Sequence, residues 1–424
     1  MTAWWARRGF VSLWLCRMLA FLGDQMMSLC LTVSVFRMLG TGAALGTFFV
    51  VRILPSALFG PVIGVLVDSS DRRFLAAAGL GLSSVFAVAL YYSGSITAVL
   101  AYSFFAAAAS TVFGHSLRSM LPEVVEKERL LKANSIQSGT ESVARLAAPA
   151  ASAAIVGIAG TSGALLMSAC SYVLAGVAAL AVSARQREGE TSLVGGTLPR
   201  ATGTRLQQSR LWGRQFHVAM RDTGRRLADG LKYLAGQSTL LMVTLVLTLV
   251  MFADSSVSPL FTILLNRHLE VPPEFIGFLS SGYGAGLLVG AIAGPLLAKR
   301  VGERGLVPVG AALVGAQMLA YSVIGVFWAA LPLQLVCGAG FALLMNGAIT
   351  AYQAVVPGHL MGRAISASTA VGSIATVFAA KAGGAVADWK GVRVVFLGAG
   401  LMSLLAAAVS LRLARVRLDA AEEA

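Results

Sequence analysis

Residues 239–265 read TLLMVTLVLTLVMFADSSVSPLFTILL, an apolar run that contains a single charged residue, Asp254. A helix needs roughly 20 consecutive apolar residues to cross the hydrocarbon core of a bilayer. Runs of comparable length recur at residues 10–37, 42–67, 74–95, 97–119, 134–158, 162–184, 239–265, 274–298, 305–327, 329–352, 362–386 and 391–414. Because lipid cannot satisfy exposed backbone groups, each run should form a helix. The sequence therefore predicts an all-α integral membrane protein with twelve transmembrane helices.

The composition of the whole chain agrees with a membrane protein. Of its 424 residues, 57% are hydrophobic and only 12% are charged, and the mean hydropathy is +0.78. Ordinary soluble domains carry about 25% charged residues. The formal net charge of +14 does not indicate nucleic-acid binding, because the basic residues flank apolar runs, where they contact anionic lipid. We expect these basic residues to interact with membrane lipids and not with nucleic acid.

The distribution of basic residues predicts the orientation of the chain. Most of the 33 Lys and Arg residues lie near the two ends, in alternate loops and in the middle stretch 185–238. The opposite set of loops holds only Arg37, Arg267, Lys390 and Arg393. Loops rich in Lys and Arg stay in the cytoplasm. Both termini and the middle loop are therefore expected to be cytoplasmic.

The middle stretch divides the chain into two halves that resemble each other. Residues 1–184 and 239–424 each contain six apolar runs, and residues 205–236 of the linker 185–238 form an amphipathic pattern typical of a helix at the lipid surface. Asp24 in the first run corresponds to Asp254 in the seventh, and Arg145 in the fifth to Lys381 in the eleventh. The sequence thus predicts two six-helix bundles related by a pseudo-twofold axis, an arrangement that in transporters places the binding site near the bilayer midplane.

A short loop between the second and third runs carries a family resemblance. It reads Gly64-Val-Leu-Val-Asp68-Ser-Ser-Asp71-Arg72-Arg73 and resembles the signature loop of the major facilitator superfamily, although Ser69 and Asp71 depart from that pattern. The chain is most similar to bacterial drug, macrolide and siderophore exporters of this superfamily in the phrases Leu22-Gly23-Asp24-Gln25, Arg52-Ile-Leu-Pro55, Leu121-Pro122-Glu123, Ala133-Asn134 and Asp229-Gly230-Leu-Lys-Tyr-Leu234. The resemblance implies transport by alternating access.

The residues of this loop suggest a conformational lock. Gly64 permits close approach of two helices, and Asp68 can interact with the end of a neighbouring helix, while Arg72 and Arg73 mark the cytoplasmic boundary. In the family that this loop resembles, such contacts stabilise one of the two access states. The residues expected to form the lock are Gly64, Asp68, Asp71, Arg72 and Arg73. The alternative is a positively charged membrane anchor with a turn.

Seven ionisable side chains lie inside the apolar runs: Arg17, Asp24, Arg52, Glu141, Arg145, Asp254 and Lys381. A charged side chain in contact with lipid costs about 2.5–3.5 kcal/mol or more. These residues should therefore face one another or a water-filled cavity. Glu141 and Arg145 are four residues apart, a spacing that allows them to pair on one helix. The family resemblance places the first, fifth, seventh and eleventh runs around a central cavity.

These residues suggest proton coupling. A carboxyl group binds a proton more tightly in a partly dehydrated cavity and less tightly beside Arg or Lys, so a helix movement can load or unload it. Asp24, Glu141 and Asp254 are candidate proton carriers, and Arg145 and Lys381 are candidate counter-charges or anion ligands. Static ion pairs that fix helix packing are the alternative. The expected proton-coupling and substrate cavity comprises Arg17, Asp24, Gln25, Glu141, Arg145, Asp254, Asn346 and Lys381.

The other expected cavity residues are mainly Met and Phe, with few polar side chains such as Gln25 and Tyr283. This composition favours amphiphilic cargo over a sugar, which needs many paired polar groups. The sequence thus predicts a proton-coupled exporter, associated with multidrug resistance, that moves a small lipophilic or amphiphilic compound such as a drug, macrolide or siderophore. A lysophospholipid flippase of the same superfamily, and a non-transporting membrane sensor or scaffold, are the alternatives.

Further expectations concern chemistry and assembly. The sequence shows no nucleophile motif, phosphate-binding loop or His/Cys cluster, and its four Cys residues are scattered singly. We therefore expect no enzymatic activity, no metal and no cofactor besides a proton gradient. The expected protein is a monomer that spans the bacterial cytoplasmic (inner) membrane many times.

Overall fold

The computed structural model describes residues 8–92, 95–126, 129–182, 224–225, 227–303 and 305–422. The predicted amphipathic helix over 205–236 lies outside the described residues up to position 223, and residues 227–236 are helical. The described chain is built from helices and contains no strand within these ranges.

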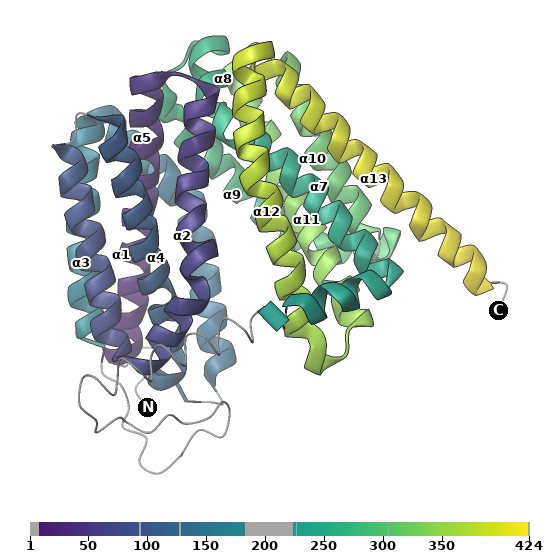
Figure 1. The fold of residues 1–424 in the computed structure, drawn as a ribbon, viewed down its shortest axis with the longest axis horizontal. Coiled ribbons are helices and arrows are strands. Elements are labelled where there is room, and N and C mark those ends of the chain that lie inside the picture. Colours follow the sequence, from purple (N-terminus) through teal and green to yellow (C-terminus); the bar gives the residue numbers. More distant parts are fainter. Residues whose placement is uncertain are drawn as a thin grey trace. The chain divides into compact units, whose positions relative to one another are not determined.

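The helices follow one another with short connections, except between α5 and α7, where most of the intervening residues lie outside the described ranges (Figure 1). In chain order they are α1 (Arg8–Leu39), α2 (Gly42–Ser69), α3 (Arg72–Tyr91), α4 (Ile96–Val124), α5 (Leu130–Leu180), α7 (Ser238–Val257), η3 (Ser258–Leu260), α8 (Phe261–His268), η4 (Pro273–Phe275), α9 (Ile276–Val301), α10 (Leu306–Val323), α11 (Phe327–Val355), α12 (Gly358–Lys390) and α13 (Val392–Glu422).

These helices account for the twelve predicted membrane crossings. Among the described residues, ten helical segments are long and apolar enough to cross a membrane, with α7 and α8 counted as one segment. The 51-residue α5 crosses twice, since a straight helix of this length would measure about 77 Å against a hydrocarbon core of about 30 Å. Together with α2, they confirm the predicted fold class.

Gly160 produces the turn within α5. Its backbone has φ 70° and ψ 176°, far from helical values. Glycine adopts positive φ without the steric penalty that a side chain imposes. The predicted fifth and sixth spans are therefore joined by a kink at one glycine, with helical residues directly on both sides.

The seventh span differs from the prediction of one continuous helix over 239–265. The 3-10 turn Ser258–Leu260 separates α7 from α8. Pro259 lies in this turn, and its ring nitrogen cannot donate the backbone hydrogen bond that a continuous α-helix would require. The break begins four residues after Asp254, so the one charged residue of this run lies in the last turn of α7 before the irregular backbone.

The described helices form two compact units. Unit 1 comprises Met1–Asp24, Leu54–Glu141 and Leu165–Arg225, and unit 2 comprises Gln25–Ile53, Ser142–Ala164 and Arg226–Ala424. Unit 2 therefore combines segments of α1, α2 and α5 with the helices of the second half. The sequence-based division at 1–184, 185–238 and 239–424 stays a prediction.

Unit 1 has a core where α1, α3, α4 and the second part of α5 meet. Tyr172 is 2% exposed and lies within this cluster, and its ring contacts Phe113 at a centroid distance of 6.3 Å. Leu13, Leu80 and Met120 are completely buried beside it. Since lipid offers no hydrophobic driving force between helices, close van der Waals packing holds such a core together.

Unit 2 contains the second set of helices, which pack in neighbouring pairs (Figure 1). α7 packs against α12 and α13, α9 against α11, and α10 against both α11 and α13. Gly286 and Gly338 lie where α9 meets α11, and a Cβ atom at either position would collide with the backbone of the other helix. Small residues thus bring these helices into direct backbone contact, as expected for helices packed in lipid.

Candidate functional site

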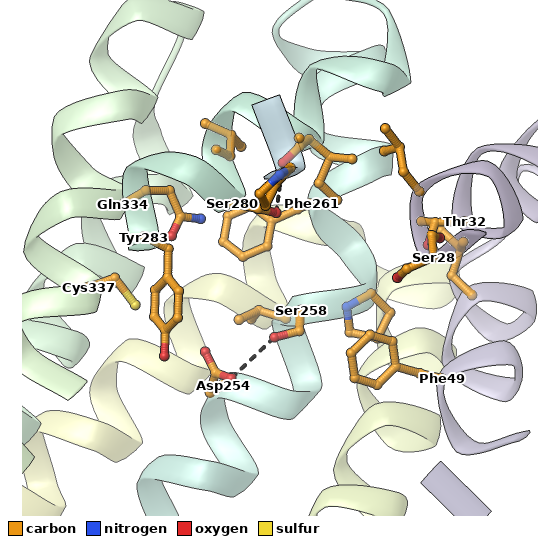
Figure 2. A pocket seen from close by; sticks show the side chains of 18 of the residues that line it. Ser28, Thr32, Phe49, Asp254, Ser258, Phe261, Ser280, Tyr283, Gln334 and Cys337 are labelled. Carbon is orange, nitrogen blue, oxygen red and sulfur yellow. Dashed lines mark hydrogen bonds between the residues drawn. The ribbon is translucent and has the colours of Figure 1, made fainter. Parts of the chain in front are cut away.

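Unit 2 contains a cavity of about 330 Å³. Its walls come from α1, α2, α5, the break between α7 and α8, α9, α10 and α11 (Figure 2). All but one of the lining residues are uncharged, either apolar or polar: Gln25, Ser28, Leu29, Thr32, Leu45, Phe48, Phe49, Pro149, Val257, Ser258, Pro259, Phe261, Ile276, Gly277, Leu279, Ser280, Tyr283, Gln317, Met318, Gln334 and Cys337. Asp254 is the one charged side chain in this described lining.

The helix break positions Asp254. Its carboxylate Oδ2 accepts a hydrogen bond from the Ser258 hydroxyl at 3.2 Å, within the last turn before Pro259. Figure 2 shows Tyr283 of α9 pointing its hydroxyl toward Asp254, with Cys337 of α11 beside it. An ionised carboxylate can accept about four hydrogen bonds, so this group has acceptor capacity for a further donor.

One polar wall is formed by a single face of α1. Gln25, Ser28 and Thr32 follow one another at spacings of three and four residues, which places them on one face of the helix. Arg52 of α2 donates a hydrogen bond to the Ser28 hydroxyl, and its guanidinium lies 5.8 Å from the centre of the Phe48 ring. Arg52 thus supports this wall without lining the cavity.

The wall formed by α5 and α9 depends on close helix contact. A Cβ atom at Gly277 would meet the carbonyl oxygen of Pro149 and the side chain of Ala153. Beside it, the Ser281 hydroxyl accepts a hydrogen bond from the backbone N–H of Ala150 at 2.9 Å. The small residues following Pro149 in the sequence therefore let α9 approach α5 and complete the cavity.

A set of polar contacts joins the end of α1 and the start of α2 to elements of the second half. Arg37 forms an ion pair with Glu274 of η4, and Arg267 of α8 donates to the carbonyl oxygen of Gly40 at 2.7 Å. Asp388 of α12 accepts hydrogen bonds from the backbone N–H groups of Gly42 and Ala43, at 2.6 and 2.8 Å. We call these contacts the clamp; all of them lie within unit 2.

Asp388 acts in the clamp as an N-cap supplied by another helix. The first N–H groups of a helix lack intrahelical partners and carry partial positive charge. The Asp388 carboxylate satisfies two of them at the start of α2. Gly42 and Gly384 allow the two backbones to touch, because a Cβ atom at either would collide with the other helix.

Two of the eight predicted cavity residues line this cavity, namely Gln25 and Asp254. Arg17 and Glu141 come together in unit 1, where Arg17 forms an ion pair with Glu141 and also donates to the amide oxygen of Gln137. The structure thus gives Glu141 a cationic partner from α1 in addition to any interaction along its own helix.

Asp24 lies in unit 1, bound by hydroxyl groups. The Tyr172 hydroxyl donates to Asp24 Oδ1 at 2.7 Å, and the Ser110 hydroxyl donates to Oδ2 at 3.1 Å. Asp24 therefore sits at the contact of α1 with α4 and the second part of α5. Asp24 corresponds to Asp254 in the sequence repeat, but the two carboxyl groups have different surroundings in the structure.

The other predicted cavity residues have different surroundings in unit 2. Arg145 and Lys381 are exposed on α5 and α12. Asn346 is half-buried on α11, and a Cβ atom at Gly294 of α9 would lie 3.5 Å from its amide nitrogen. These three side chains do not belong to the lining of the described cavity.

The predicted lock residues are partly described. Asp71 is the N-cap of α3, where its side chain accepts a hydrogen bond from the Arg73 backbone N–H at 3.0 Å. Arg72 binds Glu123 at 2.6 Å and the Ser119 carbonyl oxygen at 3.1 Å, both on α4. Gly64 and Asp68 are helical residues of α2, and the Asp68 side chain and the surroundings of Gly64 lie outside the described part of the structure. The described contacts fix the start of α3 to α4.

Sequence reasoning missed most of the polar lining. The prediction rested mainly on charged side chains and therefore did not include the neutral lining residues Ser28, Thr32, Ser280, Gln317 and Gln334. A stripe of polar residues at helical spacing on α1 was the available signal. No group of three or more His, Cys, Asp or Glu side chains placed to hold a metal ion occurs in the described part of the chain.

Comparison of the sequence with curated proteins gives distant relatives. Macrolide efflux protein A of Streptococcus pyogenes is 22% identical over 293 residues, which are 67% of this chain and 65% of that protein. The chain thus spans just under two thirds of this relative's length. An uncharacterised MFS-type transporter of Bacillus subtilis, YfiS, is 22% identical over 416 residues, which are 96% of this chain and 93% of that protein.

Solved structures share the fold of the whole chain. A bacterial homologue of the human lysosomal transporter Spinster, in an inward-facing state, has a TM-score of 0.72 at 13% identity and covers 99% of this chain and 98% of its own. An inward-facing bacterial homologue of ferroportin has a TM-score of 0.71 at 17% identity, covering 94% and 98%. The sequence also matches one family over residues 13–248 and again over residues 243–423. The chain belongs to the Major Facilitator Superfamily of transporters.

Proposed function

We propose that this transporter exports a small lipophilic or amphiphilic compound from the bacterial cytoplasm by proton antiport. The observation that carries the proposal is the cavity of unit 2, whose lining is apolar or neutral except for Asp254. Ligand pockets typically combine an apolar wall with a few polar groups that orient the ligand. The similarity to macrolide efflux proteins supports the direction of transport.

Asp254 is the proposed site of coupling. A carboxylate that lies against apolar walls binds a proton when its surroundings dehydrate and loses it when water or a positive charge returns. Alternating access changes those surroundings in each cycle. Because cargo and proton would meet the same cavity, Asp254 can link the occupancy of one to that of the other.

The clamp is the proposed closure on the outer side of the membrane. The basic loops predict a cytoplasmic location for the α2–α3 loop, so Gly40 and the start of α2, at the other end of α2, would face outward. Arg37, Arg267 and Asp388 then hold the outer ends of helices from both halves together. Export requires these contacts to open in each cycle.

Uptake into inside-out membrane vesicles tests the proposal. A thermal-shift screen of the purified protein against erythromycin, a hydroxamate siderophore and fluorescent lysophosphatidylcholine selects the cargo to be used. We expect a vesicle interior made acidic by respiration to drive uptake of that cargo, and nigericin, which collapses the pH gradient, to abolish it. Vesicles without the protein are the control.

Two results would contradict the proposal. Uptake that is indifferent to the pH gradient would reject proton antiport. Movement of the lysolipid alone, without any gradient, would instead support the alternative that this superfamily member is a lysophospholipid flippase.

A further inference from the structure

The charge balance of the cavity points to the kind of cargo it binds. Asp254 contributes the one formal charge of the lining. The other titratable lining side chains, Tyr283 on α9 and Cys337 on α11, carry no positive charge in any protonation state. A ligand that balances the charge of this cavity is therefore a cation.

The described lining contains no Arg or Lys side chain from the neighbouring helices that would balance the charge of Asp254. Arg52 of α2 reaches the wall formed by α1, where it donates to the Ser28 hydroxyl. Arg145 of α5 and Lys381 of α12 are exposed, and neither side chain lines the cavity. The described hydrogen-bond donor to Asp254 is a neutral hydroxyl group of its own helix turn. A carboxylate in such surroundings is stabilised either by a proton or by a bound cation.

The other walls suit the body of an organic cation. Phe48, Phe49, Phe261 and Tyr283 contribute aromatic rings to the lining. Aromatic faces attract ammonium groups, most strongly where water is excluded. The cavity volume of about 330 Å³ lies at the lower end of the range of about 300–1,000 Å³ for ligand pockets. A compact molecule fits this space better than a large one.

We propose that the cavity binds a compact organic monocation, an amine or quaternary ammonium with an apolar body, and that Asp254 is its counter-ion. The cation and a proton then compete for the same carboxylate. This inference rests on the proposed function, because it takes the cavity to be the cargo site. It goes further by assigning the charge and size of the cargo.

Binding of three matched probes to the purified full-length protein tests this inference by isothermal titration calorimetry. The probes are 4-phenylbutyl-trimethylammonium, the neutral analogue in which tert-butyl replaces trimethylammonium, and 5-phenylpentanoate. We expect the cation to bind at least about tenfold more tightly than the neutral analogue at pH 8, and the carboxylate to bind most weakly. Because the quaternary ammonium has no titratable proton, its affinity should fall at low pH only through protonation of the protein.

Three variants identify the group responsible. Asp254→Asn should reduce the affinity for the cation to that for the neutral analogue and remove the pH dependence, while the neutral analogue binds as before. Tyr283→Phe keeps the aromatic ring but removes the hydroxyl that points toward Asp254, and the preference for the cation over the neutral analogue should persist in this variant. Glu303→Gln alters an exposed carboxylate in the turn after α9 and is the matched control.

Several results would overturn the inference. Equal binding of cation and neutral analogue, a preference for the carboxylate, or an unchanged preference in Asp254→Asn would each do so. Failure of the cation to bind to protein with a native melting temperature would do so as well. The vesicle assay tests the proposed function separately. Proton-driven uptake without a preference for the cation would overturn this inference alone, and a preference for the cation without proton-driven uptake would overturn proton antiport alone.

Discussion

Ionisable residues that look alike in the sequence have different surroundings in the structure. Arg17, Glu141 and Asp254 each interrupt an apolar run, so the sequence predicts a similar free-energy cost for placing each of them inside the membrane. Arg17 and Glu141 neutralise each other between α1 and α5, whereas Asp254 borders a cavity with one hydroxyl donor. The ion pair therefore joins α1 to α5 within unit 1, whereas Asp254 is the carboxyl group that we propose for binding and coupling.

The ion pair predicts a stability effect. Glu141→Gln should lower the free energy of unfolding by about 1–3 kcal/mol, because Arg17 would stay in its partly buried place without its anionic partner. The double variant Arg17→Met, Glu141→Leu should lose less than the sum of the two single variants. Thermal unfolding of the detergent-solubilised proteins measures both. Strictly additive losses would show that the two side chains are not energetically coupled.

Helices are the elements that the sequence predicts best, because membrane thickness fixes their length. The expected spans agree with the helices within a few residues at most ends. Two details depended on single residues: Gly160 turns the chain inside α5 with almost no loop, and Pro259 breaks the seventh span. Both residues were visible in the sequence. A run of apolar residues does not show whether a proline bends a helix or ends it.

The clamp could not be predicted from the sequence. Arg37 and Arg267 depart from the charge pattern of the loops, but that pattern gives no reason to select Asp388 or Glu274. Their roles depend on which helix ends meet, and these residues are far apart along the chain. Of the candidate site, the sequence identified Asp254, Gln25 and Tyr283 because they interrupt apolar runs, but it missed other neutral polar lining residues such as Gln317 and Gln334.

Opening of the clamp can be followed through a native cysteine. Cys337 lines the cavity and is 5% exposed. In a background with Cys16, Cys30 and Cys170 replaced by Ser, Asp388→Asn should increase the rate at which a membrane-impermeant maleimide labels Cys337 in spheroplasts. The variant loses the negative charge that strengthens the hydrogen bonds to the N–H groups of Gly42 and Ala43. A loss of about 1–2 kcal/mol would shift the equilibrium between the closed and the open clamp by a factor of roughly 5–30.

Asp229→Asn is the matched control for this experiment, because Asp229 is an exposed carboxylate outside the clamp. It should label at the rate of the parent. If Asp388→Asn also labels at that rate, Asp388 does not hold the outer side closed.

At the scale of the whole molecule, the repeat in the sequence and the compact units divide the chain differently. The family match covers both halves in turn, yet unit 2 includes Gln25–Ile53 and Ser142–Ala164 from the first half. These first-half segments supply part of the clamp and much of the cavity wall. The sequence predicted the family and its fold, but packing decides which parts of each helix contact the other half.

The most direct measurement is cargo-induced proton movement in proteoliposomes loaded with the pH dye pyranine. The cargo selected by thermal shift is added to liposomes containing the parent protein, Asp254→Asn or Glu303→Gln. We predict a proton flux for the parent and for Glu303→Gln, and none for Asp254→Asn even though that variant stays folded. A full proton flux in Asp254→Asn would contradict the assignment of Asp254 as the coupling carboxylate.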